Sequence, residues 1–112
     1  MNYDKAHELA REIVKSDEYI EYARAKEEVS SDPDTLGLLK EVRRLEVKCQ
    51  AAMVTGESDS ESLEKLNRLM GYLAMNEAAG RYLMAEFNLN RAIGDIYRII
   101  AEAAGLDMSM LQ

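Results

Sequence analysis

The feature that most constrains this chain is an apolar line through its last long run, residues 76–106. Apolar residues return there at alternating steps of three and four, the pattern of a helix that packs along its length against other helices. The line consists of Ala79, Tyr82, Leu89, Ile93, Ile96, Ile100 and Ala103. Glu86 interrupts it with a charge, and Asn90 lies one turn later beside it. The run predicts a long packed helix with a polar interruption.

Two helices are expected ahead of the chain's only proline. Residues 3–15 and residues 17–29 carry apolar side chains at helical spacing. Ser16 or Asp17 resembles the N-cap of the second segment, although one kinked helix would give the same pattern. Asp32 and Pro33 then suit the start of a third helix, which we expect to end near Val54.

Polar breaks mark the remaining helix boundaries. Gly56 suits a helix end, and Ser58 followed by Glu61 has the spacing of a capping box for a fourth helix over residues 61–73. Asn76 is the expected cap of the fifth helix, and Gly105 its end. Residues 107–112 are expected to form a short frayed tail.

These elements predict an all-α protein, a four- or five-helix bundle in a single domain over residues 1–112. The two long helices, the third and the fifth, are expected to be antiparallel partners in the core. A shift of 44 positions places Asp32-Pro33 on Asn76-Glu77, which indicates either an internal duplication or the chance alignment of two amphipathic hairpins.

The length of the fifth helix predicts a homodimer. At 1.5 Å per residue it would be about 40 Å long, well beyond the radius of about 13 Å of a compact domain of this size. Its ends should project or be covered by a second copy. The residues we expect at an oligomer or partner interface are Glu86, Leu89, Asn90, Ile93, Ile96 and Ile100.

Glu86 has three interpretations. The apolar stripe could rotate locally, with Leu83 and Phe87 facing inward and Glu86 at the edge. Glu86 could instead make a buried polar contact that fixes register or dimer pairing. The arginines available for that contact are Arg43, Arg44 and Arg91. The third interpretation is a small-molecule or ion site that uses Glu86 and Asn90 in the core.

Charge and composition argue against several function classes. The formal charge of −7 disfavours direct binding of nucleic acid over the whole surface. With one histidine, His7, and one cysteine, Cys49, the usual metal and nucleophile templates fail, so no enzyme activity and no cofactor are expected. No apolar run reaches the roughly 20 residues of a membrane span, and no secretory signal is seen, so a cytoplasmic protein is expected.

Several segments resemble the YlbF/YmcA family of small bacterial helical proteins, in particular its short YheA-type branch. They are Tyr19-Ile20-Glu21-Tyr22, Asp32-Pro33 followed by Leu38-Leu39, residues 82–86 leading to Leu89-Asn90, and residues 96–101 leading to Gly105. The resemblance covers nearly the whole chain and consists mainly of helix-packing residues.

The resemblance implies a cytoplasmic, oligomeric, non-enzymatic regulator. The best-known members of that family act in a multiprotein complex that modulates RNA processing and thereby competence, sporulation and biofilm formation. Family paralogues and an RNA-decay complex are therefore the implied partners. Those members carry extra cysteines associated with iron–sulfur clusters, whereas this chain has only Cys49, so no cluster is expected here.

Overall fold

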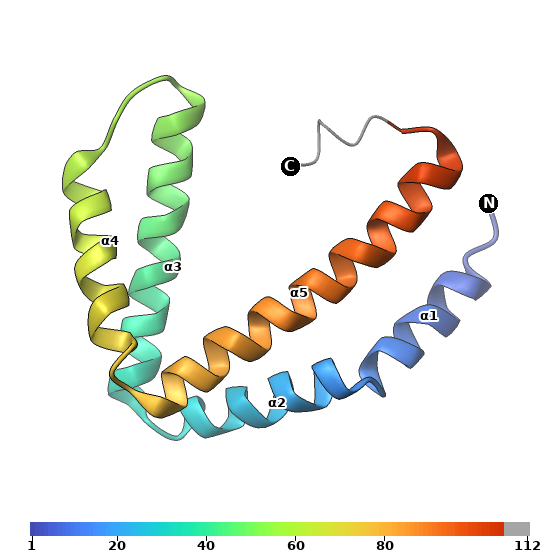
Figure 1. Ribbon diagram of the computed structural model, residues 1–112, viewed down its shortest axis with the longest axis horizontal. Coiled ribbons are helices and arrows are strands. Elements are labelled where there is room, and N and C mark those ends of the chain that lie inside the picture. Colours follow the sequence, from blue (N-terminus) through green and yellow to red (C-terminus); the bar gives the residue numbers. More distant parts are fainter. Residues whose placement is uncertain (107–112) are drawn as a thin grey trace. The chain divides into compact units, whose positions relative to one another are not determined.

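The computed structural model describes residues 1–106, which are all-α, with five helices and no strand. The predicted frayed tail, residues 107–112, lies outside the described residues. The helices, in chain order, are α1 (Asp4–Val14), α2 (Asp17–Ser30), α3 (Pro33–Val54), α4 (Ser60–Leu73) and α5 (Glu77–Ala104). The predicted order is confirmed, and α1 and α2 are two separate helices (Figure 1).

Side-chain caps explain where three of the helices begin. The Asp32 carboxylate accepts hydrogen bonds from the backbone N–H groups of Asp34 and Thr35 at the start of α3. The Asn76 side-chain oxygen accepts from the N–H of Ala79 at the start of α5, at 3.1 Å. Between α1 and α2, the Ser16 hydroxyl oxygen accepts from the Tyr19 N–H at 3.2 Å. Each cap satisfies N–H groups that have no partner inside the helix.

The start of α4 differs from the prediction. The cap is Asp59, not Ser58, and the capping residue is followed three positions later by Ser62 rather than Glu61. One Asp59 oxygen accepts from the Ser62 N–H at 3.0 Å, and the other accepts from the Ser62 hydroxyl at 2.8 Å. A carboxylate can accept both bonds at once, which explains why Asp59 is used in place of the neighbouring serine.

The helix ends at Gly56 and Gly105 are confirmed as predicted. Both glycines adopt positive φ angles, 77° and 70°, in the left-handed region that glycine adopts without steric cost. In each case the next residue donates its N–H back to the helix, from Glu57 to the Ala52 carbonyl and from Leu106 to the Ala101 carbonyl. These bonds use carbonyl groups that the last helical turn leaves without a partner.

The described chain divides into two compact units. Unit 1 contains residues 1–23 and 84–106, and unit 2 contains Arg24–Leu83. Unit 2 thus holds the last turns of α2, the whole of α3 and α4, and the first turns of α5. Unit 1 holds α1, the start of α2 and the remainder of α5.

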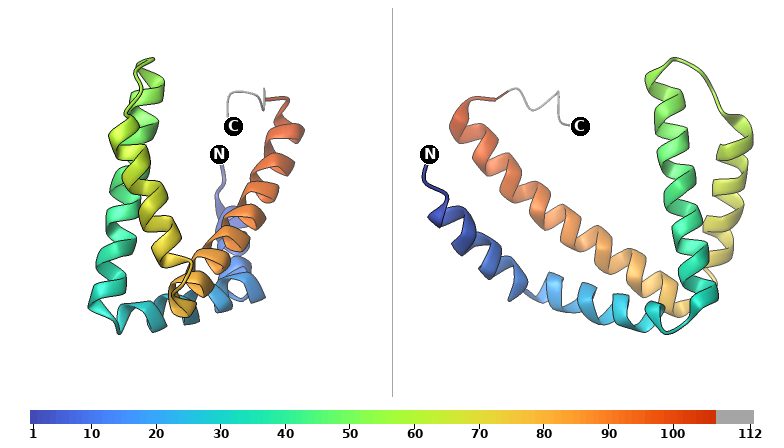
Figure 2. Two further views of the ribbon diagram at one scale, coloured as in Figure 1. Left: turned by 60° about the vertical axis from the view of Figure 1, so that its left-hand side comes forward. Right: turned by 180° about the vertical axis from the view of Figure 1, so that it is seen from behind.

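Unit 2 is built on the pairing of α3 with α4, which lie side by side in all the views (Figures 1 and 2). The sequence predicts that α3 pairs with the long fifth helix. Within unit 2, the helix that lies along α3 is instead α4. The first turns of α5 join the same core through Ala79. Loop length accounts for this pairing, because the short connection over residues 55–59 favours an antiparallel neighbour.

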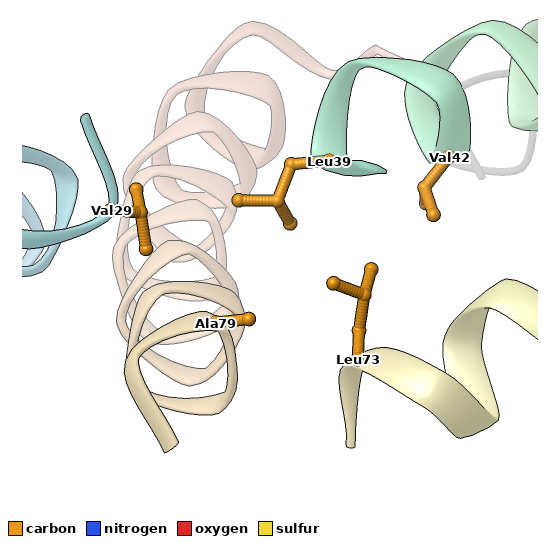
Figure 3. Packing of buried hydrophobic residues seen from close by; sticks show 5 residues of the cluster. All are labelled: Val29, Leu39, Val42, Leu73 and Ala79. Carbon is orange, nitrogen blue, oxygen red and sulfur yellow. The ribbon is translucent and has the colours of Figure 1, made fainter. Parts of the chain in front are cut away.

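The core of unit 2 draws one or two side chains from each of four helical segments. Its buried residues are Val29, Leu39, Val42, Leu73 and Ala79, which point toward one another in Figure 3. Leu73 and Ala79 are completely buried. Burial of a leucine side chain stabilises the fold by about 1.5–3 kcal/mol, so this small cluster makes a large contribution to unit 2.

Candidate interaction surface on the fifth helix

The part of α5 in unit 1 carries two apolar seams instead of the single predicted line. The inner seam is Ala85, Leu89, Ala92 and Ile96, whose side chains are buried or half-buried. The outer seam, which starts one position later, is Glu86, Asn90, Ile93, Tyr97 and Ile100. Both seams advance by steps of four and three, so each follows one face of the helix.

α1 explains why the inner seam is covered. A hollow of about 200 Å³ is lined by Leu9, Glu12 and Ile13 from α1, by Ser16 and Glu18 around the start of α2, and by Leu89, Ala92, Ile93 and Ile96 from α5. Ile93 lies at the edge of this hollow, because its side chain is 43% exposed. Leu89 is only 8% exposed. The apolar side of α1 and the inner seam of α5 therefore belong to the same packed layer of unit 1.

The outer seam has large apolar side chains exposed to solvent. Ile93, Tyr97 and Ile100 are 43%, 47% and 54% exposed. Single exposed apolar residues are normal on a protein surface, whereas a row of them at seam spacing is typical of a surface that associates. The regular spacing of these three residues is what makes α5 the candidate site.

The six predicted interface residues are divided between the two seams. Leu89 and Ile96 lie in the inner seam, which packs inside unit 1. Glu86, Asn90, Ile93 and Ile100 lie in the outer seam. Tyr97 was not among the predicted residues, although its spacing of four from Ile93 and three from Ile100 is the signal that identifies it.

Glu86 and Asn90 differ in burial. The Glu86 side chain is half-buried, and Asn90 is exposed. The interpretation that turned Phe87 inward is not supported, because Phe87 is 62% exposed. Within residues 1–106, no group of three or more His, Cys, Asp or Glu side chains is placed to hold a metal ion.

Glycines inside α5 leave room beside the helix. Gly94 lies inside α5, where glycine costs stability relative to alanine, and the close approach of a neighbouring helix is one reason to tolerate that cost. Apart from its chain neighbours and the backbone of its own helical turns, a methyl group placed on Gly94 would meet no described atom within 4 Å. No other helix of the described part of the chain therefore approaches Gly94 closely, and Gly94 leaves open space on α5 between the outer seam and Phe87.

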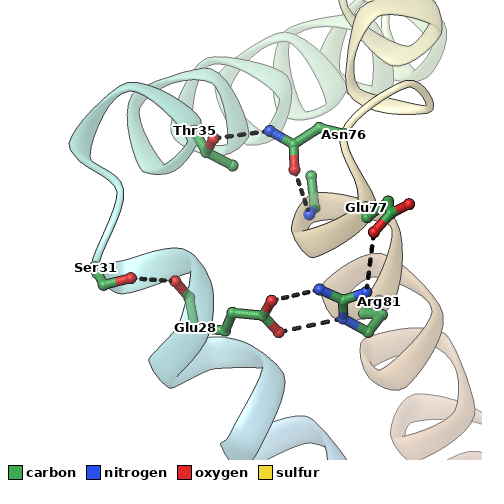
Figure 4. Close-up of polar contacts among 7 residues, drawn as sticks. Glu28, Ser31, Thr35, Asn76, Glu77 and Arg81 are labelled. Atoms are coloured by element: carbon green, nitrogen blue, oxygen red, sulfur yellow. Dashed lines mark hydrogen bonds and ion pairs between the residues drawn. The ribbon is translucent and has the colours of Figure 1, made fainter.

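The other polar cluster, in unit 2, joins the starts of α3 and α5. The Asn76 side-chain amide donates to the Thr35 hydroxyl at 3.0 Å (Figure 4). That hydroxyl in turn donates to Asp32 at 2.7 Å. Thr35 is buried. The two residues that the 44-position shift aligns, Asp32 and Asn76, are thus linked through one threonine.

Hydrogen bonds also set the electrostatics of this cluster. The bonds from Thr35 hold the pKa of Asp32 below its ordinary value. The Arg81 guanidinium pairs with both oxygens of Glu28, which lowers the pKa of that carboxyl (Figure 4). Arg81 also lies 3.9 Å from Glu77. The bonds satisfy caps and connect helices, so this cluster serves to position the start of α5.

None of the helices in the described part of the chain is long and apolar enough to cross a membrane. His7 lies on α1 and is exposed, and Cys49 is a half-buried free thiol on α3.

Comparison with known proteins identifies the family. Residues 2–104 match the family model described as "Control of competence regulator ComK, YlbF/YmcA". The chain is 35% identical to a UPF0342 protein of Clostridium tetani, over 96% of this chain and 93% of that protein. It is 34% identical to a UPF0342 protein of Symbiobacterium thermophilum, over 95% and 96% of the two chains. This chain therefore belongs to the YlbF/YmcA family.

Proposed function

We propose that this protein is a non-enzymatic regulatory or scaffold protein of the cytoplasm that acts through protein–protein contacts. The observation that carries the proposal is the outer seam of α5, where Ile93, Tyr97 and Ile100 expose large apolar surfaces at helix-packing spacing. The family model describes a regulator, which supports the same class of function.

A homodimer through α5 is the assembly that the outer seam fits best. A second copy of the helix would bring an identical row of Ile93, Tyr97 and Ile100 against the first, as a two-fold interface requires. Gly94 leaves space for a side chain of that copy beside the helix. Glu86 and Asn90, at one end of the seam, would then fix the register of the pair.

The proposal extends to larger assemblies. A paralogue that carries the same helix-packing pattern would occupy the place of the second copy along the seam. Through such contacts the protein would join a complex that controls RNA processing, the role that its family resemblance implies. The protein itself then needs neither a catalytic centre nor direct contact with nucleic acid.

The test combines an affinity pull-down with a matched pair of variants. The tagged protein is recovered from its host after mild crosslinking, and its partners are identified by mass spectrometry. Ile100→Asp places a charge on the outer seam and should remove the second copy and any partner that takes its place along the seam. Ile99→Asp is the control, because Ile99 is on the same helix and 67% exposed but lies off the seam.

Three outcomes of this test can be told apart. Recovery of paralogues or RNA-decay factors by wild type and Ile99→Asp, with loss in Ile100→Asp, supports the proposal. Equal recovery by all three proteins would exclude the seam as the contact surface. Recovery of no protein would favour the small-molecule alternative at Glu86. In that case a ligand should raise the melting temperature of wild type and not that of Glu86→Ala.

A further inference from the structure

A second surface, in unit 2, combines an apolar floor with a basic rim. The hollow has a volume of about 200 Å³ and lies where the last turns of α2, the first half of α3 and the start of α5 meet. Its floor is Val29, Leu36, Leu39, Val42, Tyr82 and Leu83. All these residues belong to unit 2, so the hollow is a feature of that unit by itself.

The size of the hollow suits one large apolar side chain. An engineered apolar cavity of about 150 Å³ is enough to bind benzene. The hollow is somewhat larger, so the ring of a phenylalanine or the side chain of a leucine fits. Leu36 and Leu39 on α3, with Tyr82 and Leu83 on α5, provide walls that would contact such a group.

The rim of the hollow has the opposite charge from the protein as a whole. Lys26, Lys40 and Arg43 line it, together with the single carboxylate Glu46, which lies 3.8 Å from Arg43. The chain carries a formal charge of −7. An acidic partner is thus repelled by most of the surface and attracted at this place, which selects both the partner and its orientation.

The wall formed by α3 has helical spacing. Leu36, Lys40, Arg43 and Glu46 follow one another at steps of four, three and three, so one strip of the helix provides both apolar floor and basic rim. A strip of this kind is suited to a partner helix that lies along it, with an apolar anchor in the hollow and acidic residues one turn before and after.

We propose that this hollow binds a helical segment of a partner protein that carries one large apolar anchor flanked by Asp or Glu residues. The inference rests on the proposed function, since it names the kind of partner that a protein–protein regulator would recognise. It assigns this role to unit 2, whereas the outer seam of α5 in unit 1 serves the second copy. The two surfaces can be tested separately.

Photocrosslinking in the host tests the identity of the occupant. Benzoylphenylalanine replaces Leu36 in the hollow or, as a control, Leu63 on α4, which is half exposed and does not line it. Crosslinked peptides are sequenced by mass spectrometry. The expected product joins position 36 to a segment with a large apolar residue and at least two acidic residues within one turn on either side, and position 63 does not give it.

A charge reversal then tests the rim. The captured segment is synthesised as a labelled peptide and titrated by fluorescence anisotropy. Lys40→Glu should weaken its binding about tenfold or more, whereas Lys65→Glu, the same change on α4 outside the hollow, should leave it within about twofold. Lys40→Ala gives an intermediate loss and takes the place of Lys40→Glu if that variant does not fold.

Other outcomes overturn the inference. Crosslinks from position 36 to a second copy of this chain, to nucleic acid, or to segments without acidic residues would show a different occupant. Equal binding by Lys40→Glu and Lys65→Glu would show that the rim is not used. If wild type recovers partners whose crosslinks arise only from α5, the inference fails and the proposed function stands. If no partner is recovered at all, both fail.

Discussion

The two units bury their apolar residues to different extents. Unit 2 closes a core from four helical segments, in which Leu73 and Ala79 are fully buried. In unit 1, α1 buries none of its side chains, and α5 leaves Ile93, Tyr97 and Ile100 about half exposed. Unit 2 has the packing of a domain core, whereas unit 1 resembles one half of an interface.

This difference indicates that the two units are stabilised in different ways. A closed core and linked helix caps stabilise unit 2 through contacts within that unit. An open seam leaves unit 1 with apolar surface whose burial would stabilise it only on association. The sequence predicts a single domain over residues 1–112. That the two units unfold together stays a prediction, and the first experiment below addresses it.

Leu73→Ala should have the largest effect. Leu73 is fully buried in the core of unit 2, so the substitution loses transfer free energy and leaves a cavity, which together cost about 2–5 kcal/mol of unfolding free energy. Leu63→Ala is the control on the same helix, where the side chain is 50% exposed. Its cost should stay below about 1 kcal/mol. Urea unfolding followed by circular dichroism measures both.

Leu89→Ala extends this test to unit 1. Leu89 is the most buried large side chain of the inner seam, at 8% exposure. A cost well below that of Leu73→Ala would support the contrast between the units. An equal cost in a monomeric sample would break it, because unit 1 would then have a core of the same quality as unit 2.

Glu86→Leu should change the association of unit 1. A polar residue within an apolar seam sets register and oligomeric state at a cost in stability. With leucine there the apolar row is extended, and we expect a change in the mass of the assembly or about a tenfold change in its dissociation constant. Glu102→Leu, on an exposed position on the opposite side of α5, is the matched control. Sedimentation equilibrium measures the mass, and an unchanged mass with unchanged melting would rule out the register role.

The helices could be predicted from the sequence because their signals are local. Asp32 before Pro33 and a glycine with positive φ at position 105 each fix a boundary through contacts within a few residues. At the start of α4 the local signal was ambiguous, since Ser58 and Asp59 are adjacent and both can cap. Hydrogen bonds to two groups of Ser62 decide for Asp59.

The candidate site could be predicted only in part, because it depends on which neighbour covers α5. Ile93 and Ile96 have the same side chain and lie on adjacent faces of one helix. Ile96 faces the layer that α1 covers, whereas Ile93 is 43% exposed at its edge. The position of α1 follows from tertiary packing, which the periodicity of α5 does not encode. The single apolar line that the sequence predicts for α5 is therefore divided into an inner and an outer seam in the structure.

Asn76→Ala should have a moderate effect, confined to unit 2. The substitution removes the cap of α5 and the hydrogen bond to the Thr35 hydroxyl, and helix caps contribute about 1 kcal/mol. Asn88→Ala, on an exposed position of α5 in unit 1, should alter stability by less than about 0.5 kcal/mol. A double-mutant cycle with Thr35→Val then isolates the coupling between the two caps. Additive effects would show that the caps act independently.

Acid should weaken unit 2 through a small and specific effect at Asp32. Hydrogen bonds from Thr35 and Asp34 favour the charged carboxylate in the folded state and lower its pKa below the ordinary value of 3.8. A lowered pKa gives stability that is fully present above the pKa of the unfolded chain and is lost as pH falls through the folded value. The loss should therefore begin near pH 4 and grow toward pH 2.

Asp32→Asn separates this titration from capping itself. The single side-chain oxygen of asparagine still accepts the hydrogen bonds from the backbone N–H groups, loses the bond from the Thr35 hydroxyl, and does not titrate. The variant should therefore start from a lower melting temperature at pH 5, and that temperature should fall less between pH 5 and pH 2 than the melting temperature of wild type. Asp59→Asn, at the start of α4, should behave in the same way, because hydrogen bonds from Ser62 lower the pKa of Asp59 as well. Both carboxylates belong to unit 2. A different result would place the acid sensitivity in unit 1. In that case acid would dissociate the assembly, the circular dichroism of the helices would not change, and both variants would melt like wild type. The acid-sensitive contact would then be the outer seam of unit 1, and not the caps of unit 2.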